Sequence, residues 1–313
     1  MSPDLQFRTD RTPLVPPGQS DLHTRDMTAT FSADVTLETA QQKLAQIDQL
    51  LPIDGNPTST LGQLIETNST GPLRLGYGAW RDLLLGCQFQ NGRGELITAG
   101  GRTVKNVAGY DLTKFMVGQR GIFGRLVTIT TRTYRRPAGA ILAQAAHDAQ
   151  LINRLLPTPL RPQWLVHTRD STLCGYLADQ RTLEYYRRAL PEHLSAEITA
   201  RSVEEDINHR STLWQAAGVD GSLRAAVTPA KVLEFTAAAA LNEFAADGAF
   251  GIVIGITDRA QHNNIGAAAQ AAGGSVYFIE DGRAAAQIDP AQQALLQRLK
   301  AAFDPEGKLE ALT

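Results

Sequence analysis

The stretch Gly100–Gly124, GGRTVKNVAGYDLTKFMVGQRGIFG, decides how the rest of this chain is interpreted. It holds six glycines within a run of strand-like sequence. Glycine inside a strand pattern marks a bulge, a tight turn or a place where another group approaches the backbone closely. Gly118, Gly121 and Gly124 recur at every third residue, which is too regular for a single turn. The stretch therefore predicts a backbone shaped to lie against a ligand.

Length and composition narrow the class of protein. A chain of 313 residues favours two domains over one. The formal net charge of -2 gives no electrostatic case for nucleic acid or anionic membranes as partners. The two cysteines, Cys87 and Cys174, argue against a disulfide framework, a cysteine-ligated zinc site or an iron–sulfur cluster within the chain. The sequence shows no transmembrane run and no apolar core of a secretory signal, so we expect a cytoplasmic protein.

Hydrophobic periodicity divides the chain into three regions. Residues 1–26 are rich in proline and short polar residues and predict a poorly ordered arm. Residues 27–137 predict a first domain of strands and short helices, with Asn68–Gly78 as a loop. The elements expected there are strands at Met27–Ala33, Asp82–Gln90, Glu95–Ala99 and Arg125–Tyr134, and helices over Leu37–Leu51, Leu61–Thr67 and Tyr110–Met116.

Residues 138–313 predict an α+β sandwich, in which one antiparallel sheet carries helices on one face and the C-terminal tail packs back on the first domain. The charge run Glu204–Asp206 is typical of a solvated surface. The elements expected are strands at Gln163–His167, Thr172–Leu177, Ser222–Val227, Phe250–Ile256 and Ser275–Ile279, and helices over Thr182–Leu190, Ala230–Phe244, Gln261–Ala272 and Gln292–Phe303.

Several motifs of the first domain carry a resemblance to a known family. They are Thr60-Leu61-Gly62, Thr67–Pro72, Gly76-Tyr77-Gly78, Arg81-Asp82, Gly100–Asp111 with the string VKNVAGYD, and the triplet Gly118, Gly121 and Gly124. From about Arg25 to Pro137 the chain resembles the FAD-binding PCMH (vanillyl-alcohol oxidase-like) family, and within it the FAD-binding subunit of bacterial glycolate oxidase. The second half is similar more loosely, chiefly at Leu223–Pro229 and Phe303–Gly307.

The resemblance implies a fold and a site. It implies a PCMH-type FAD-binding domain, with FAD extended between two α+β subdomains and its diphosphate on backbone N–H groups. Small residues would be needed there because a side chain would block the approach of the ligand to the backbone. The competing interpretation is that the glycines serve tight turns in a sheet that binds no ligand. The cofactor-binding residues that the resemblance implies are Thr60, Gly62, Thr67, Asn68, Ser69, Gly71, Tyr77, Gly78, Asp82, Lys105, Asn106, Gly109, Gly121, Gly124 and Val127.

The chain departs from the family pattern near its start. No glycine-rich loop precedes Asp54, although such a loop wraps the diphosphate in the family, and Gln63 stands where the pattern has a second glycine. Losing three charge-assisted hydrogen bonds would cost about 5–9 kcal/mol, or roughly three to six decades of affinity. The sequence is thus N-terminally shortened relative to the pattern. Three outcomes stay open: weak non-covalent binding of FAD, a site completed by a partner, or loss of the flavin.

The function implied is that of an FAD-binding subunit of a glycolate oxidase-type dehydrogenase, which oxidises glycolate or a similar 2-hydroxy acid to the 2-oxo acid. The implied partners are a larger flavoprotein subunit and an iron–sulfur subunit, with attachment to the inner membrane through them. A structural subunit without flavin and a stand-alone dehydrogenase are the alternatives. No catalytic base can be matched to this sequence, and its six histidines lack metal-ligand spacing, so we expect no metal site.

Overall fold

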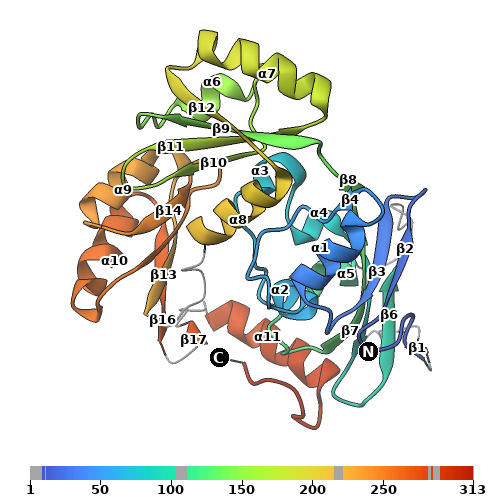
Figure 1. Cartoon of the computed structure of the whole chain (residues 1–313). Helices are drawn as coiled ribbons and strands as arrows, with labels where there is room; N and C mark the ends of the chain where they lie inside the picture. The colour runs from blue at the N-terminus through green and yellow to red at the C-terminus, as the bar shows by residue number, and fades with distance from the viewer. Residues whose placement is uncertain are drawn as a thin grey trace. The chain divides into compact units, whose positions relative to one another are not determined.

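A computed structural model describes residues 9–10, 12–102, 111–214, 221–280, 283–284 and 290–312. The chain forms two compact units, which are coloured by residue number in Figure 1. Unit 1 comprises Met1–Thr70, Gly78–Arg136 and Gln287–Thr313, and unit 2 comprises Gly71–Tyr77 and Pro137–Ala286. The C-terminal segment therefore belongs to the same unit as the N-terminal half, and a short piece of that half belongs to unit 2.

Unit 1 is built on a six-stranded sheet in the order β1-β6-β5-β7-β3-β2, and its described strand pairs are antiparallel. Strands β4 and β8 pair with each other and form a separate two-stranded sheet. The elements are β1 (Thr9–Asp10), β2 (Ser20–His23), β3 (Thr28–Ser32), α1 (Leu37–Ala45), β4 (Gln49–Leu50), α2 (Leu61–Glu66), α4 (Trp80–Leu83), β5 (Leu84–Gln90), β6 (Leu96–Gly100), α5 (Leu112–Phe115), β7 (Arg125–Arg132), β8 (Tyr134–Arg135) and α11 (Pro290–Phe303).

The two faces of this sheet differ in character because successive side chains of a strand point to opposite sides. Phe31 and Ile129 are fully buried in a core with α1 and α2. On the opposite face, Gln88 accepts the Thr128 hydroxyl at 3.0 Å and the amide of Leu14 at 2.7 Å. The segment that precedes β2 thus supplies a hydrogen bond to the buried Gln88 on the polar face of the sheet.

The N-terminal region corrects one expectation. Ser20–His23 was expected to lie in a poorly ordered arm, but it forms β2 and pairs with β3 along its whole length. Val15 is buried, and the amide of Gly18 donates to Asp34 Oδ1 at 2.9 Å. The composition of this region did not reveal these bonds, because β2 forms only by pairing with β3, and composition does not show that pairing.

Unit 2 is a nine-stranded sheet in the order β12-β9-β11-β10-β14-β15-β13-β16-β17, in which every described pair is antiparallel. The elements are α3 (Arg74–Tyr77), β9 (Gly139–Ala145), α6 (Leu151–Leu155), β10 (Trp164–His167), β11 (Thr172–Ala178), α7 (Gln180–His193), β12 (Ala196–Arg201), α8 (Val203–Leu213), β13 (Ser222–Ala226), η1 (Pro229–Lys231), α9 (Val232–Ala238), β14 (Phe244–Asp247), β15 (Ile252–Ile256), η2 (Arg259–Gln261), α10 (His262–Ala271), β16 (Ser275–Glu280) and β17 (Arg283–Ala284).

Helices cover both faces of this sheet, although they were expected on one. Helices α6 and α7 pack on Ile141 and Cys174, while α9 and α10 pack on Val253. Trp214, directly after α8, packs instead with Leu142 and other residues of the opposite face. The alternation of buried residues along β9 explains the difference, because each second side chain faces the other layer.

Two expected helices are shorter than the periodicity predicts. Helix α1 begins at the predicted cap, Thr36, but ends at Ala45 because Asp48 turns the chain with φ +57°. The expected helix Ala230–Phe244 reduces to α9, and Phe244 begins β14 instead. Ala240, with φ +50°, ends that helix, so pairing with β10 and β15 overrides the helix propensity of the alanines.

Two further expectations are wrong. The segment Asn68–Gly78 is not wholly a loop, since it contains α3, and the expected strand from Asp82 begins only at Leu84, after α4. The charge run Glu204–Asp206 is not wholly solvated, because Asp206 is fully buried. Asp206 accepts the indole N–H of Trp164 at 3.2 Å and pairs with Arg210, one turn further along α8.

Candidate functional site

Unit 1 contains a pocket of about 520 Å³, a volume within the range of small-molecule sites. Its walls come from the end of β3, the first turn of α2, the loop that leads into β7, and the C-terminal segment. Three residues of the predicted site, Thr60, Gly62 and Gly121, meet in this one pocket. Gly121 lies about sixty positions after Thr60 and Gly62 in the sequence, so the fold brings it to them.

The first turn of α2 is closed by hydrogen bonds within the chain. Thr60 and Gln63 form a capping box, in which the Gln63 amide donates to Thr60 Oγ1 at 3.2 Å and the Thr60 amide donates to Gln63 Oε1 at 3.0 Å. The amides of Leu61 and Gly62 donate to carbonyls of Val35 and Ala33. Gln63, a departure from the family pattern, therefore stabilises the helix that carries the site.

The loop that leads into β7 is attached to the other end of α2. The amide of Gly118 donates to Ile65 O and that of Arg120 to Glu66 O, both at 2.9 Å. The Leu126 amide donates to Glu66 Oε1 at 3.2 Å. Desolvation raises the pKa of Glu66, the nearby Glu310 adds to that rise, and the Leu126 amide and Arg125 oppose it.

The glycines of the predicted site lie against the protein itself. A Cβ at Gly62 would be 3.0 Å from the carbonyl oxygen of Ala33. At Gly124 it would be 2.6 Å from the Phe89 ring, and at Gly121, where φ is +77°, it would be 3.0 Å from Glu310 Cγ. Close internal packing thus gives these three positions a reason to be glycine that does not depend on a ligand.

Other residues of the predicted site serve local structure. Asn68 turns the chain after α2 with φ +50°, the Thr67 hydroxyl donates to Gln63 O at 2.7 Å, and the Ser69 amide donates to Leu64 O. Asp82 Oδ2 accepts the Ala79 amide at 2.8 Å and lies against Gly78, where φ is +89°. These contacts shape the backbone after α2 and at the start of α4.

The remaining predicted residues fall elsewhere. Gly71 and Tyr77 belong to unit 2. The carbonyl of Val127 accepts the Ala33 amide at 2.9 Å and so joins β7 to the end of β3. Lys105, Asn106 and Gly109 lie outside the described residues.

The charged residues of the pocket were missed by the sequence analysis. Two arginines, Arg120 and Arg125, and three carboxylates, Asp34, Glu66 and Glu310, line it. The arginines could have been found, because Arg120 directly precedes Gly121 and Arg125 directly follows Gly124. Glu310 could not, since only the path of the C-terminal segment brings it to α2.

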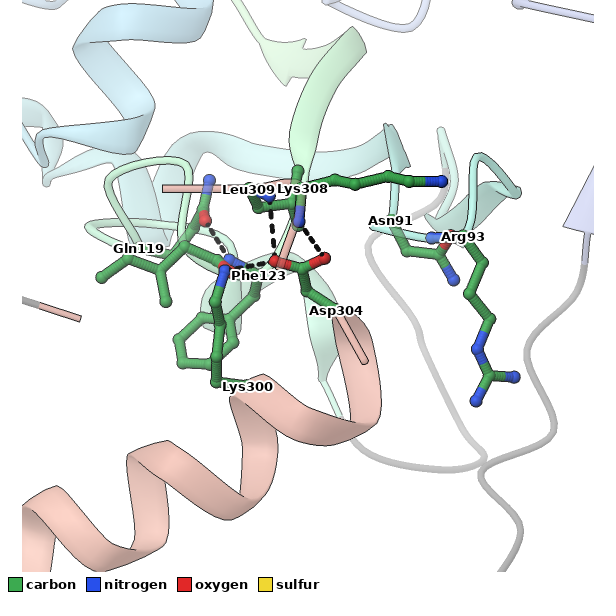
Figure 2. Close-up of polar contacts among 9 residues, drawn as sticks. Asn91, Arg93, Gln119, Phe123, Lys300, Asp304, Lys308 and Leu309 are labelled. Carbon is green, nitrogen blue, oxygen red and sulfur yellow. Dashed lines mark hydrogen bonds and ion pairs between the residues drawn. The ribbon is translucent and has the colours of Figure 1, made fainter. Parts of the chain in front are cut away.

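The C-terminal segment is held in place by Asp304, just after α11 (Figure 2). Its carboxylate accepts hydrogen bonds from the amides of Lys308 and Leu309, at 2.8 and 2.9 Å. It also forms an ion pair with the ammonium group of Lys300 at 2.6 Å. Burial opposes ionisation, but the Lys300 ammonium and these amides lower the pKa of Asp304 to about 2. Phe303 packs beside it on Phe89, Phe115 and Phe123.

Two other kinds of site find no support in the described part of the chain. No group of three or more histidine, cysteine, aspartate or glutamate side chains there could hold a metal ion. Among the described residues, no helix combines the length and apolar character needed to cross a membrane.

His167 is buried in unit 2, and its Nδ1 atom shares a hydrogen bond of 2.8 Å with the hydroxyl of Thr172. Burial lowers the pKa of His167 to about 4. These features are those of a structural residue.

Comparison with known proteins adds a family context. Over 107 residues the chain is 35% identical to glycolate oxidase subunit GlcE of Escherichia coli, a match that covers 34% of this chain and 31% of that protein. Over 122 residues it is 27% identical to the mitochondrial D-lactate dehydrogenase (cytochrome) of Arabidopsis thaliana, a match that covers 39% of this chain and 22% of that protein. No family model matches the chain.

The structure resembles solved structures over most of its length. An alkyldihydroxyacetonephosphate synthase superposes with a TM-score of 0.65 at 12% identity, covering 91% of this chain and 63% of that one. The chain has the PCMH-type FAD-binding fold. The resemblance and the fold class inferred from the motifs are thereby confirmed.

The relatives of this chain include glycolate oxidase subunits, D-lactate and D-2-hydroxyglutarate dehydrogenases and FAD-linked oxidoreductases. The matched segment spans less than a third of the length of each of these proteins. Guanidinium groups such as those of Arg120 and Arg125 are suited to a diphosphate, and in this pocket they share the lining with three carboxylates.

Proposed function

We propose that this chain is the FAD-binding subunit of a glycolate oxidase-type dehydrogenase, which oxidises glycolate or a similar 2-hydroxy acid to the 2-oxo acid. One observation carries the proposal: two separate motifs, one holding Thr60 and Gly62 and the other Gly121, line a single pocket together with two arginines. The FAD-linked oxidoreductases and 2-hydroxy acid dehydrogenases among the relatives support the reaction class.

The residues of the pocket would act by binding and orienting. Arg120 and Arg125 would pair with the phosphates, because guanidinium groups make charge-assisted, bidentate hydrogen bonds to phosphate oxygens. The hydrogen bonds from Gly118 and Arg120 to α2 would hold the loop rigid during binding. Bound FAD would supply the hydride acceptor, which the side chains of the protein cannot provide.

We also propose that the chain works within a complex. Glycolate oxidase subunits are among its relatives, and this supports a larger flavoprotein subunit as partner. An iron–sulfur subunit, and a place at the inner membrane through such partners, belong to the same proposal. A partner could also complete the phosphate site that the chain begins.

A second function has an observation in its favour. The amides of residues 60–63 in the first turn of α2 are all bonded to acceptors of the chain, and three carboxylates share the pocket with the two arginines. A structural subunit that keeps the fold without flavin would show these features. The two functions differ in whether the pocket binds FAD at all.

Binding of FAD distinguishes them. The chain is purified alone and co-expressed with a larger flavoprotein subunit, and flavin absorbance and FAD titrations are recorded for the wild type, for Arg120→Ala/Arg125→Ala, and for Arg93→Ala as a control. Arg93 is an exposed arginine of unit 1 that does not line the pocket. Each lost charge-assisted hydrogen bond should weaken binding by about tenfold to a hundredfold.

Flavin bound by the wild type and by Arg93→Ala, but lost or weakened in the double variant, supports the proposal. Absence of flavin from the chain alone, together with no flavin in the complex beyond that of the flavoprotein subunit by itself, favours the structural subunit. Equal binding by the double variant would show that FAD does not use this pocket.

A further inference from the structure

The C-terminal segment lies on one wall of the pocket. Gly121 is buried, and the Cγ atom of Glu310 is the nearest heavy atom to the position that a Cβ would take there, at 3.0 Å. Glu310 itself is exposed and lines the pocket, so its side chain is not buried in the core. The backbone at Gly121 is therefore covered by the protein's own acidic side chain.

The segment is fixed there by a short, well-bonded connection. The amides of Lys308 and Leu309, the two residues before Glu310, both donate to Asp304. Figure 2 shows the Asp304 carboxylate between these amides and the side chain of Lys300, which also donates to Ile122 O at 3.0 Å. Because Ile122 follows Gly121, the Lys300 side chain joins the C-terminal segment to the loop that carries Gly121.

The position of Glu310 affects the charge of the pocket. Three carboxylates face two guanidinium groups, so the lining carries a formal charge of 2 − 3 = −1 when all five groups are ionised. Glu310 also acts on Glu66, whose pKa it helps to raise. An anionic ligand entering beside Gly121 would meet this excess negative charge first.

We propose that Glu310 sets the charge selectivity of this pocket: its carboxylate disfavours the phosphate end of a nucleotide beside Gly121. The inference deepens the proposed function and rests on its assignment of the pocket to a nucleotide. Neutralising Glu310 strengthens binding of phosphate-bearing ligands and leaves a flavin without phosphate unaffected. The C-terminal segment, rather than α2 alone, then decides how tightly the site holds its ligand.

The test compares Glu310→Gln and Glu310→Lys with Glu306→Gln in the full chain. Glu306 is the matched control, because it is an exposed carboxylate of the same segment that pairs with Lys308 and does not line the pocket. The probes are ADP, FAD and riboflavin, titrated by calorimetry or fluorescence. Circular dichroism and unfolding curves establish that all variants fold alike.

We expect Glu310→Gln to bind ADP and FAD about fivefold more tightly than the wild type, which corresponds to about 1 kcal/mol. Glu310→Lys should gain more, and both gains should shrink as salt rises from about 0.05 to 0.5 M because the charges are screened. Riboflavin should bind all variants equally, and Glu306→Gln should match the wild type.

The outcomes separate this inference from the function. If wild type and Glu310→Gln bind FAD and ADP equally, the inference is wrong and the flavin function stands. If ADP binds more tightly to Glu310→Gln while FAD binds to none, the inference holds and the flavin function is wrong. No binding of any probe to any variant contradicts both.

Discussion

Gly92 donates its amide to the carbonyl of Phe303 at 3.0 Å, and a Cβ added at Gly92 would overlap the Asp304 side chain. The hairpin loop between β5 and β6 and the end of α11 therefore meet without any intervening side chain. This contact joins the C-terminal segment to the sheet of unit 1 and, through Asp304, to the pocket wall at Gly121.

Gly92→Ala should destabilise unit 1. The added methyl group must displace the end of α11, and overpacking of this kind costs about 1–3 kcal/mol. Gly101→Ala is the matched control, because a Cβ there has no heavy atom within 4 Å and should change stability by less than about 0.5 kcal/mol. Guanidinium chloride unfolding measures both, and equal midpoints for the two variants would show that α11 does not pack on Gly92.

Asp304→Asn should destabilise the chain by about 1–3 kcal/mol at pH 7, because hydrogen bonds to an ionised carboxylate weaken. The folded pKa of Asp304, about 2, lies below its ordinary value of 3.8, so its contribution is fully present above pH 4 and is lost as pH falls toward 2. The difference in unfolding free energy between wild type and variant should therefore narrow across that interval. A difference that stays constant from pH 6 to 2.5 would contradict the role of the charge.

Asp206 and Arg210 should show strong coupling in unit 2. Both side chains are buried, and removing either leaves the other charge unpaired, which costs about 3–5 kcal/mol. Asp206→Leu and Arg210→Met should each destabilise the fold, while the double variant should cost much less than the sum. The pair of the half-buried Asp148 and the exposed Arg154 is the control cycle and should couple by no more than about 1 kcal/mol. Additive effects at both pairs would refute the prediction.

Cys87 and Cys174 should resist thiol reagents in the native protein. Each is free and buried, one in each unit, and burial raises the pKa of both thiols to about 12. Because the thiolate is the reactive form, labelling by Ellman's reagent at pH 8 should require opening of the fold. Two thiols should react in denaturant, and rapid labelling of either cysteine without denaturant would show that its unit is loosely packed.

Many elements could be predicted because their signals are local. Thr36 and Thr60 accept hydrogen bonds from the amides three residues on, so the starts of α1 and α2 follow from the sequence around them. The β-branched run of β7 and the paired strands β10 and β11 were predicted for the same reason. Strands β2 and β14 were not predicted, because each forms by pairing with other strands: β2 with β3, and β14 with β15 and the distant β10.

Only part of the candidate site could be predicted from local sequence signals. Thr60, Gly62 and Gly121 stand in motifs that a sequence displays, and so do the arginines beside Gly121. Glu66 and Glu310 carry no motif, and their part in the pocket depends on where α2 ends and where the last residues run.

By itself, the sequence determined the family resemblance, the α+β class and the starts of several helices, since each of these depends on neighbouring residues and their spacing. Only the tertiary structure decided that the last residues cover Gly121, that Asp206 is buried, and that the glycines pack against the chain's own atoms. Those facts depend on contacts between distant segments, which form only when burial of apolar surface brings the segments together.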